Sequence, residues 1–351
     1  MRAERIEAKW IDAFHRVFDL CRVRGGENVA ILSETQSRPV LVELAELALS
    51  RLGAVAFHIV VPSPPEAAPV PVRSTGASRT LAGHTAAIAA LEAADMVVDL
   101  TVEGLLHSPE LSHILRAGAR VLMISNEHPE ALERLVPEPE MEGKVKAAVK
   151  RCRGSQEMRV VSAAGTELIV AMAGASSVGV WGWTDRPGTV AHWPGGLVVS
   201  FPKAHSVNGR LVLDAGDVNL TFKRYLERPV VLTIEDDYVT AIEGEGTDAE
   251  LMRRYFAAWG DREAYATSHV GWGLNERARY EALAMYGRSD TNGTEIRAFA
   301  GNFLYSTGAN EFADRFTLGH FDLPVRNCTI TLDGAVVVNA GRPVDLAGNL
   351  E

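Results

Sequence analysis

The chain has 351 residues, of which 47% are hydrophobic and 23% are charged, and this is the composition of a globular protein of about two domains. Its formal net charge is −10 and it has no long run of Lys or Arg, which excludes nucleic acid as a partner because phosphate binding needs clustered basic residues. No apolar stretch is long enough and free enough of glycine to span a bilayer, and the first residues lack the apolar region of a signal peptide. We therefore expect a cytoplasmic protein that does not enter membranes.

Short apolar runs alternate with helical patterns in the first part of the chain. Helices are predicted at 6–21, 39–52, 84–94 and 109–115, and strands at 29–32, 54–61, 96–100 and 121–125. This alternation is typical of a parallel sheet with helices on its faces, so we predict a Rossmann-like α/β domain over residues 1–155. The segment 62–78, rich in Pro, Ala and Ser, is the one long irregular connection, and such loops are often functional or mobile.

The pattern changes after a helix predicted at 138–151. Strands are predicted at 158–162, 167–172, 197–201, 211–214, 230–234, 238–243, 296–303 and 329–338, with turns at Asn208-Gly209 and Asp333-Gly334. Helices predicted at 249–259 and 276–285 interrupt them. We predict an α+β domain over residues 156–351. The first domain has no GxGxxG motif, so a dinucleotide cofactor is not indicated.

The most informative motif is the His-x-Asp pair formed by His320 and Asp322. Side chains at i and i+2 of a strand point to the same face, about 6–7 Å apart at Cα, so an imidazole and a carboxylate can bind one metal ion. Pro324 cannot donate to a strand ladder, which predicts a strand end or a sheet edge here. With His269 as a third ligand, two histidines and one carboxylate would form the facial triad of non-heme Fe(II) oxygenases. The alternative is a strand histidine that is only hydrogen-bonded.

Three further histidines lie in predicted loops. His107 follows the strand at 96–100, where the ligand crevice of a doubly wound sheet lies, so it is a candidate site residue. The alternative is a surface histidine beside a helix that Ser108 caps. His192 and His205 flank the turn at 194–196, and we interpret both as ordinary loop histidines.

The segment from Ser268 to Asn275, followed by the His-x-Asp pair 51 positions after His269, resembles the 2,5-dihydroxypyridine 5,6-dioxygenases of nicotinate and nicotine degradation. The resemblance covers the whole chain. It implies the two-domain build of the related thermophilic metallo-aminopeptidases, of the aminopeptidase T type. It also implies an Fe(2+) cofactor on His269, His320 and Asp322, and His107 as the acid–base residue. The reactants would be a small heteroaromatic substrate and O2, the product N-formylmaleamate, and the protein a homo-oligomer.

The resemblance to the peptidases implies a site for two metal ions, and this chain differs from them at the ligands of that site. Leu197 stands where the peptidases have a glutamate, His269 stands where they have a second glutamate, and Leu304 lies near the position of a histidine. A leucine side chain cannot bind a metal, so the sequence favours a single ion. Two alternatives stay open, namely a metallo-aminopeptidase with rearranged ligands and a non-catalytic small-molecule binding protein with the same fold.

Overall fold

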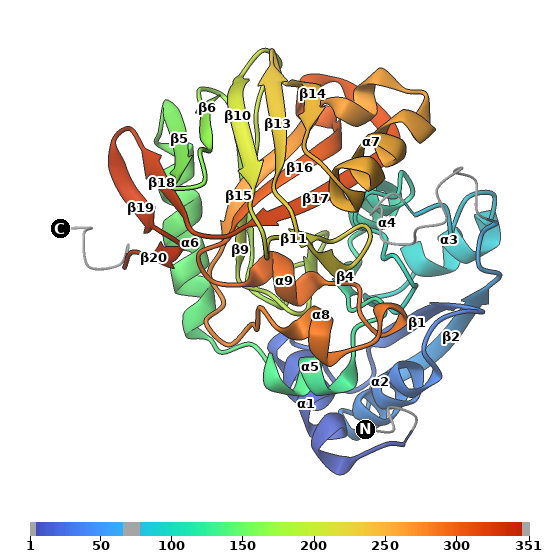
Figure 1. The fold of residues 1–351 in the computed structure, drawn as a ribbon. Helices are drawn as coiled ribbons and strands as arrows, with labels where there is room; N and C mark the ends of the chain where they lie inside the picture. Colours follow the sequence, from blue (N-terminus) through green and yellow to red (C-terminus); the bar gives the residue numbers. More distant parts are fainter. Residues whose placement is uncertain (1–4, 66–77, 346–351) are drawn as a thin grey trace.

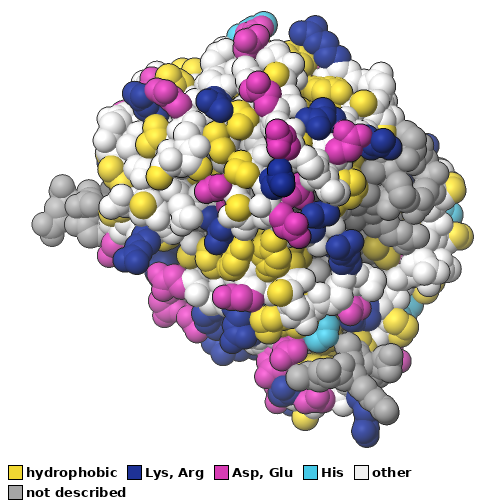
Figure 2. All heavy atoms as spheres, viewed as in Figure 1, with side chains coloured by type: hydrophobic (Ala, Val, Ile, Leu, Met, Phe, Trp, Pro, Cys, Tyr) yellow, Lys and Arg dark blue, Asp and Glu magenta, His cyan; other side chains and the backbone are white. Residues whose placement is uncertain are grey.

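The computed structural model describes residues 5–65 and 78–345 (Figure 1). Most of the irregular connection predicted at 62–78 lies outside these residues. In Figure 1 the blue and cyan strands and helices at the lower right belong to a parallel α/β unit, and most of the green to red strands above them belong to an antiparallel unit. On the face shown in Figure 2, Lys and Arg side chains are interspersed with Asp and Glu. Within the described residues no helix has both the length and the apolar character needed to cross a membrane.

The parallel sheet has the strand order β2-β1-β3-β4-β8, and every neighbouring pair in it is parallel. Its strands are β1 (Asn28–Glu34), β2 (Val55–Val61), β3 (Met96–Asp99), β4 (Arg120–Met123) and β8 (Val190–His192). The helices of this unit are α1 (Ala8–Leu20), α2 (Pro39–Arg51), α3 (Thr85–Glu92), α4 (Leu111–Ala117) and α5 (Pro129–Arg134). Side chains of α1 and α2 fill one core cluster and side chains of α3 and α4 fill another. The predicted Rossmann-like arrangement is confirmed.

The strand β8 lies beyond residue 155 in the chain, yet it completes the parallel sheet by pairing with β4. Trp193, directly after β8, is fully buried in the core of α1 and α2, with its ring 5.1 Å from that of Phe14. Its indole N–H donates to the carbonyl of Leu135 at 2.8 Å. The division of the chain near residue 155 stays a prediction. At β8, a segment from beyond that boundary joins the sheet formed by the first part of the chain.

Two antiparallel sheets form the second unit, as the predicted α+β class requires, and the class is confirmed. One has the order β14-β13-β10-β6-β5-β18-β19-β20 and the other the order β17-β16-β15-β9-β7. The strands of the first are β5 (Glu157–Ser162), β6 (Glu167–Ala171), β10 (Val207–Leu213), β13 (Val230–Glu235), β14 (Tyr238–Glu243), β18 (Cys328–Leu332), β19 (Ala335–Asn339) and β20 (Arg342–Pro343). Those of the second are β7 (Ser176–Val180), β9 (Leu197–Phe201), β15 (Thr267–Gly273), β16 (Phe303–Asn310) and β17 (Arg315–Val325).

The two antiparallel sheets pack against each other through one large core. Val270, Tyr305 and Leu323 supply it from the β17–β7 sheet, and Val160 and Leu211 from the other. Helices and a hairpin surround the sheets: α6 (Glu140–Arg153), α7 (Thr247–Trp259), α8 (Ala282–Met285), α9 (Thr294–Ala298), the 3₁₀ turns Arg262–Tyr265, Arg288–Asp290 and Glu311–Ala313, and β11 (Val218–Asn219) with β12 (Arg224–Tyr225). Because strand side chains alternate, the opposite face of the β17–β7 sheet carries a different set of residues.

Three predicted elements are wrong. The strand at 296–303 is instead α9 followed by a connection to β16, because the buried carboxylate of Glu127 accepts the N–H of Thr294 at 2.7 Å and fixes the start of that helix. The helix at 276–285 shrinks to α8. The Asn208-Gly209 turn lies inside β10, where a Cβ on Gly209 would come within 2.2 Å of the Glu167 carbonyl oxygen. The glycine there serves a close approach of strands.

Candidate metal centre

One row of side chains crosses the three strands β15, β16 and β17. His269 pairs with Ser306, and Ser306 pairs with Asp322, so the three residues stand side by side. His320 precedes Asp322 by two residues on β17, the edge strand, and points to the same face. The register of β15 shifts between Thr267 and His269, and such a bulge re-aims the side chains next to it. The strand and edge positions predicted from Pro324 are confirmed.

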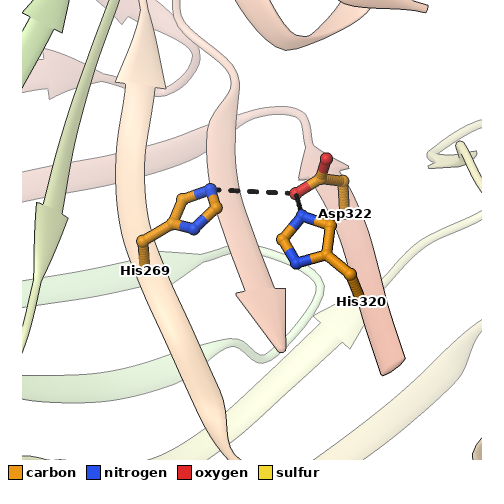
Figure 3. Close-up of side chains that lie close together, drawn as sticks. All are labelled: His269, His320 and Asp322. Carbon is orange, nitrogen blue, oxygen red and sulfur yellow. Dashed lines mark ion pairs between the residues drawn. The ribbon is translucent and has the colours of Figure 1, made fainter. Parts of the chain in front are cut away.

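The imidazoles of His269 and His320 and the carboxylate of Asp322 point toward one another (Figure 3). Candidate ligand atoms of the three residues all lie within 4.8 Å of one another. The Oδ1 atom of Asp322 is 3.2 Å from Nε2 of His320 and 3.8 Å from Nε2 of His269. All three side chains are buried. Three donors facing one point on a rigid sheet can hold a metal ion on one side and leave its other positions open.

The hydroxyl of Ser268 sets the tautomer of His269. It donates its single hydrogen to the carbonyl of Ala309 at 2.5 Å, so it can only accept from Nδ1 of His269, 3.1 Å away. The imidazole therefore carries its hydrogen on Nδ1 and presents the lone pair of Nε2 towards Asp322. A hydrogen bond from the far ring nitrogen is what orients metal-binding histidines in proteins.

Asp322 is held from two sides. The Nε of Arg297 lies 2.5 Å from Oδ2, and the hydroxyl of Ser306 donates to Oδ1. Burial opposes ionisation, but the Arg297 guanidinium and the His320 imidazole outweigh it and hold the pKa of Asp322 well below its usual range. Burial lowers the pKa of His269 to about 4, although Asp322 partly offsets it. An ionised carboxylate and a neutral imidazole are the protonation states that bind a cation.

His107 reaches the same place from the parallel unit. It is half-buried in the loop after β3, and its ring lies 4.8 Å from that of His320 and 6.5 Å from that of His269. Burial and the two neighbouring imidazoles hold the pKa of His107 well below its usual value. A neutral imidazole thus faces the three candidate ligands across the junction of the two units.

Sequence reasoning missed three residues that lie around the candidate ligands, namely His192, Arg297 and Ser306. His192 ends β8 and is buried, and its Nδ1–H donates to the carbonyl of Pro194 at 2.6 Å. Burial lowers its pKa to about 4, and the charges of Arg297 and Asp322 act on it as well. The carboxyl end of a parallel strand would have pointed to His192, but a strand of three residues leaves little pattern. His205, by contrast, is exposed and pairs with Asp236.

Leu197 and Leu304 lie on the same face of the sheet as the candidate ligands and pack together with Val199 in a small buried cluster. The ring of Phe201 packs against this cluster and lies 5.2 Å from that of His269. Apolar side chains thus occupy the positions at which the peptidase resemblance implied further ligands. The neighbourhood of the three donors is therefore aliphatic and aromatic on this side.

Comparisons with known proteins agree with this architecture. A family model described as 2,5-dihydroxypyridine 5,6-dioxygenase matches residues 9–345. The 2,5-dihydroxypyridine 5,6-dioxygenase of Pseudomonas putida KT2440 is 38% identical over 338 residues, which cover 95% of each chain. A solved structure of the 2,5-dihydroxypyridine dioxygenase from the same organism superposes with a TM-score of 0.91 at 37% identity, over 97% of this chain and 99% of that one. Wild-type AmpT from Thermus thermophilus, at 16% identity and a TM-score of 0.66 over 96% and 99% of the two chains, shares the fold.

Proposed function

Because this chain belongs to the family of the 2,5-dihydroxypyridine 5,6-dioxygenases, we propose that it opens the ring of 2,5-dihydroxypyridine with O2 to give N-formylmaleamate. It is then an oxidoreductase whose reactants are a small heteroaromatic molecule and O2, and both oxygen atoms enter the product. The observation that carries the proposal is the convergence of His269, His320 and Asp322 on one point that His107 faces.

The donor set fits one ferrous ion, held by His269, His320 and Asp322. Two neutral imidazoles and one carboxylate on one side of a metal are the ligands of non-heme Fe(II) oxygenases. The leucine cluster of Leu197 and Leu304 supports a single ion, because it offers no further donor atom. When bound, ferrous iron supplies a Lewis acid for the ring hydroxyl and a redox partner for O2.

His107 would act as the acid–base residue. Its neutral ring lies beside the rings of His320 and His269, so a substrate bound next to the ligands would lie within its reach. It can accept a proton from a substrate hydroxyl and return it as the ring opens, and a positioned imidazole typically contributes about 10²–10⁴-fold to such a reaction. In this proposal the antiparallel unit supplies the metal ligands and the parallel unit supplies the residue that transfers protons.

Two aromatic rings and one guanidinium would orient the substrate. Phe201 lies against His269, and the ring of Phe312 is 5.5 Å from that of Phe201, which gives a flat heteroaromatic ring an apolar wall. Arg297 brings a positive charge to Asp322 at the edge of the site. Because this charge is paired with the Asp322 carboxylate, Arg297 would act on the substrate by fixing the position of that carboxylate.

An anaerobic preparation reconstituted with Fe(II) tests the proposal. With 2,5-dihydroxypyridine as substrate, we expect the uptake of one O2 molecule for each ring that is opened. The metal-free protein should take up no O2. Peptide hydrolysis without O2 uptake would favour a metallo-aminopeptidase with rearranged ligands. Binding of the pyridine without turnover would favour a non-catalytic binding protein.

Variants of the ligands give the first prediction. His320→Ala and Asp322→Ala each remove one of three donors, so we expect both variants to lose iron during gel filtration and to show no activity. Iron content per chain, measured by a colorimetric chelator, is the readout. His205→Ala, at an exposed histidine outside the site, is the matched control and should keep its iron. Full iron occupancy in either ligand variant would disprove the triad.

We also propose that the enzyme is cytoplasmic and forms a homo-oligomer. The family resemblance supports both statements. Light scattering coupled to gel filtration measures the mass of the assembly directly. A mass equal to that of a single chain would contradict the second statement.

A further inference from the structure

The loop between β3 and α4 carries His107, and a buried carboxylate holds the first half of its backbone. Asp99 is the last residue of β3, and its side chain is fully buried. Its Oδ1 accepts the N–H of Thr101 at 3.0 Å and the Thr101 hydroxyl at 2.6 Å, and its Oδ2 accepts the N–H of Leu105 at 2.7 Å. The Thr101 hydroxyl accepts in turn from the N–H of Gly104 at 3.2 Å.

A second buried carboxylate reaches the same loop from β1. The Oε1 of Glu34 accepts the N–H of Val102 at 3.1 Å, and its Oε2 accepts the hydroxyl of Thr80 at 3.0 Å. Four of the five backbone N–H groups from residue 101 to residue 105 thus donate to side chains that these two carboxylates hold or provide. Buried carboxylates are costly unless they are satisfied, and the donors of this loop satisfy both of them.

The anchored stretch ends next to His107. The Leu105 side chain is buried among α3, α4 and the parallel sheet, and its carbonyl accepts the N–H of Ser108 at 2.9 Å. His107 therefore stands within a single turn whose two sides are both fixed. Since Asp99 binds Leu105 directly, its carboxylate sets where this turn begins and how the imidazole faces His320.

We propose that Asp99 is a positioning residue of the ring-opening reaction, acting through His107 by holding the N–H groups of Thr101 and Leu105. The inference rests on the proposed function, because it takes His107 as the acid–base residue. It assigns to β3 a role in catalysis at a point far from the candidate metal ligands in the sequence.

Asp99→Asn tests the proposal with almost no change of shape. An amide offers an acceptor oxygen on one side only, so either Thr101 or Leu105 loses its acceptor. We expect kcat to fall about 10–100-fold, because a displacement of about 1 Å has that effect on a reacting group. KM and iron content should not change. Asp217→Asn is the matched control, since Asp217 is also buried and accepts the backbone N–H groups of Asp214 and Arg326 at 2.8 and 2.9 Å, away from the loop. It should keep the parent kcat.

A double-mutant cycle with His107→Ala separates positioning from general loosening. In the His107→Ala background, Asp99→Asn should lower kcat no further. An equal loss in both backgrounds, or an unchanged kcat in Asp99→Asn alone, would overturn the inference and leave the proposed function intact. Full activity of His107→Ala would instead remove the acid–base role of His107 and the inference with it.

Thr101 provides a second route if Asp99→Asn does not fold. Thr101→Val keeps the side-chain shape but removes both the donor to Asp99 and the acceptor for Gly104, so it should lower kcat in the same way. Thr101→Ser restores the hydroxyl and should restore kcat. Equal activity of the Val and Ser variants would overturn the proposal.

Discussion

The carboxylate of Asp322 divides its two oxygens between different neighbours. Oδ1 faces the two imidazoles, and Oδ2 faces the guanidinium of Arg297. Because Arg297 binds Oδ2, Oδ1 is the oxygen that faces a bound ion. The positive charge of Arg297 also keeps the carboxylate ionised. Partners of metal ligands often matter for affinity nearly as much as the ligands themselves.

Arg297→Gln should weaken metal binding without removing a ligand. We expect about 10–100-fold lower Fe(II) affinity, since loss of a ligand's hydrogen-bonding partner typically has this effect. The measurement is anaerobic competition with a calibrated chelator. Arg326→Gln is the control, because Arg326 also pairs with a buried aspartate, Asp217, in the same unit. Equal affinities of the parent and Arg297→Gln would show that the guanidinium does not support Asp322.

His192 makes stability depend on pH in a predictable direction. Burial lowers its pKa to about 4 from 6.5, so on acidification the unfolded chain binds a proton before the folded chain does. Stability present above pH 6.5 is therefore lost as the pH falls towards 4, by about 3 kcal/mol at about 1.4 kcal/mol per pH unit.

His192→Asn removes this dependence but can keep the donor to Pro194. Urea unfolding of the metal-free protein across the window from pH 6.5 to 4 should give a shallower loss of stability in the variant than in the parent. His113→Asn, at an exposed histidine of α4, should follow the parent curve. Parallel curves for the parent and His192→Asn would contradict the prediction.

At the scale of elements, β15 depends on two glycines that let other backbones approach it. A Cβ on Gly271 would lie 2.0 Å from the carbonyl oxygen of Val198, and one on Gly273 would lie 2.1 Å from that of Phe299. Gly271 is two residues from His269, so any shift of β15 away from β9 moves a candidate ligand. The glycines of this motif thus serve the packing that places the histidine.

Gly271→Ala should therefore destabilise the protein and disturb the site together. We expect a loss of about 1–3 kcal/mol or more in the free energy of unfolding, because the added methyl group overpacks a rigid contact. Chemical denaturation measures the loss, and iron content measures the effect on the site. Gly143→Ala in α6, where nothing lies within 4 Å of the added Cβ, should instead be neutral or stabilising. A neutral Gly271→Ala would show that β9 can move.

Sequence patterns predicted the helices and strands in which apolar residues recur at a regular spacing. The helical spacing of α1 and the alternation of β3, α4 and β4 are set by local burial, and the structure has them close to where they were predicted. The start of α9 was missed because it depends on Glu127, which is distant in sequence. Likewise, the His-x-Asp pair was visible as a spacing, whereas Arg297 and Ser306 come to Asp322 through the fold and leave no local pattern.

At the scale of the whole molecule, the candidate site lies where the two units meet. His107 follows β3 and His192 is the last residue of β8, both in the parallel sheet, while His269, His320 and Asp322 lie on an antiparallel sheet. Since β8 and Trp193 tie the second half of the chain into the first core, the two sets of residues are linked by covalent chain as well as by packing. This link constrains how far the units can separate.

A fragment ending at residue 155 should consequently not fold on its own. It lacks β8 and the buried side chains of Trp183 and Trp193, so the edge of β4 and part of the core around α1 and α2 would be exposed. We expect rapid cleavage by a low dose of protease and no near-ultraviolet circular dichroism. A fragment ending at residue 196, which keeps these elements, is the comparison. A stable fragment of 155 residues would show that the boundary predicted there is a true domain limit.

The row of His269, Ser306 and Asp322 across three paired strands has a consequence for the durability of the centre. Strand spacing in a sheet is nearly invariant, about 4.8 Å, so the gap between the outer two residues is set by backbone pairing and not by any loop. Ser306 occupies the position between them, so the space between the two candidate ligands is that of one serine. Insertions in the surrounding loops can then alter which molecules enter, while the spacing of the candidate ligands stays the same. The loss of an ion bound there would, on heating, report the melting of the sheet.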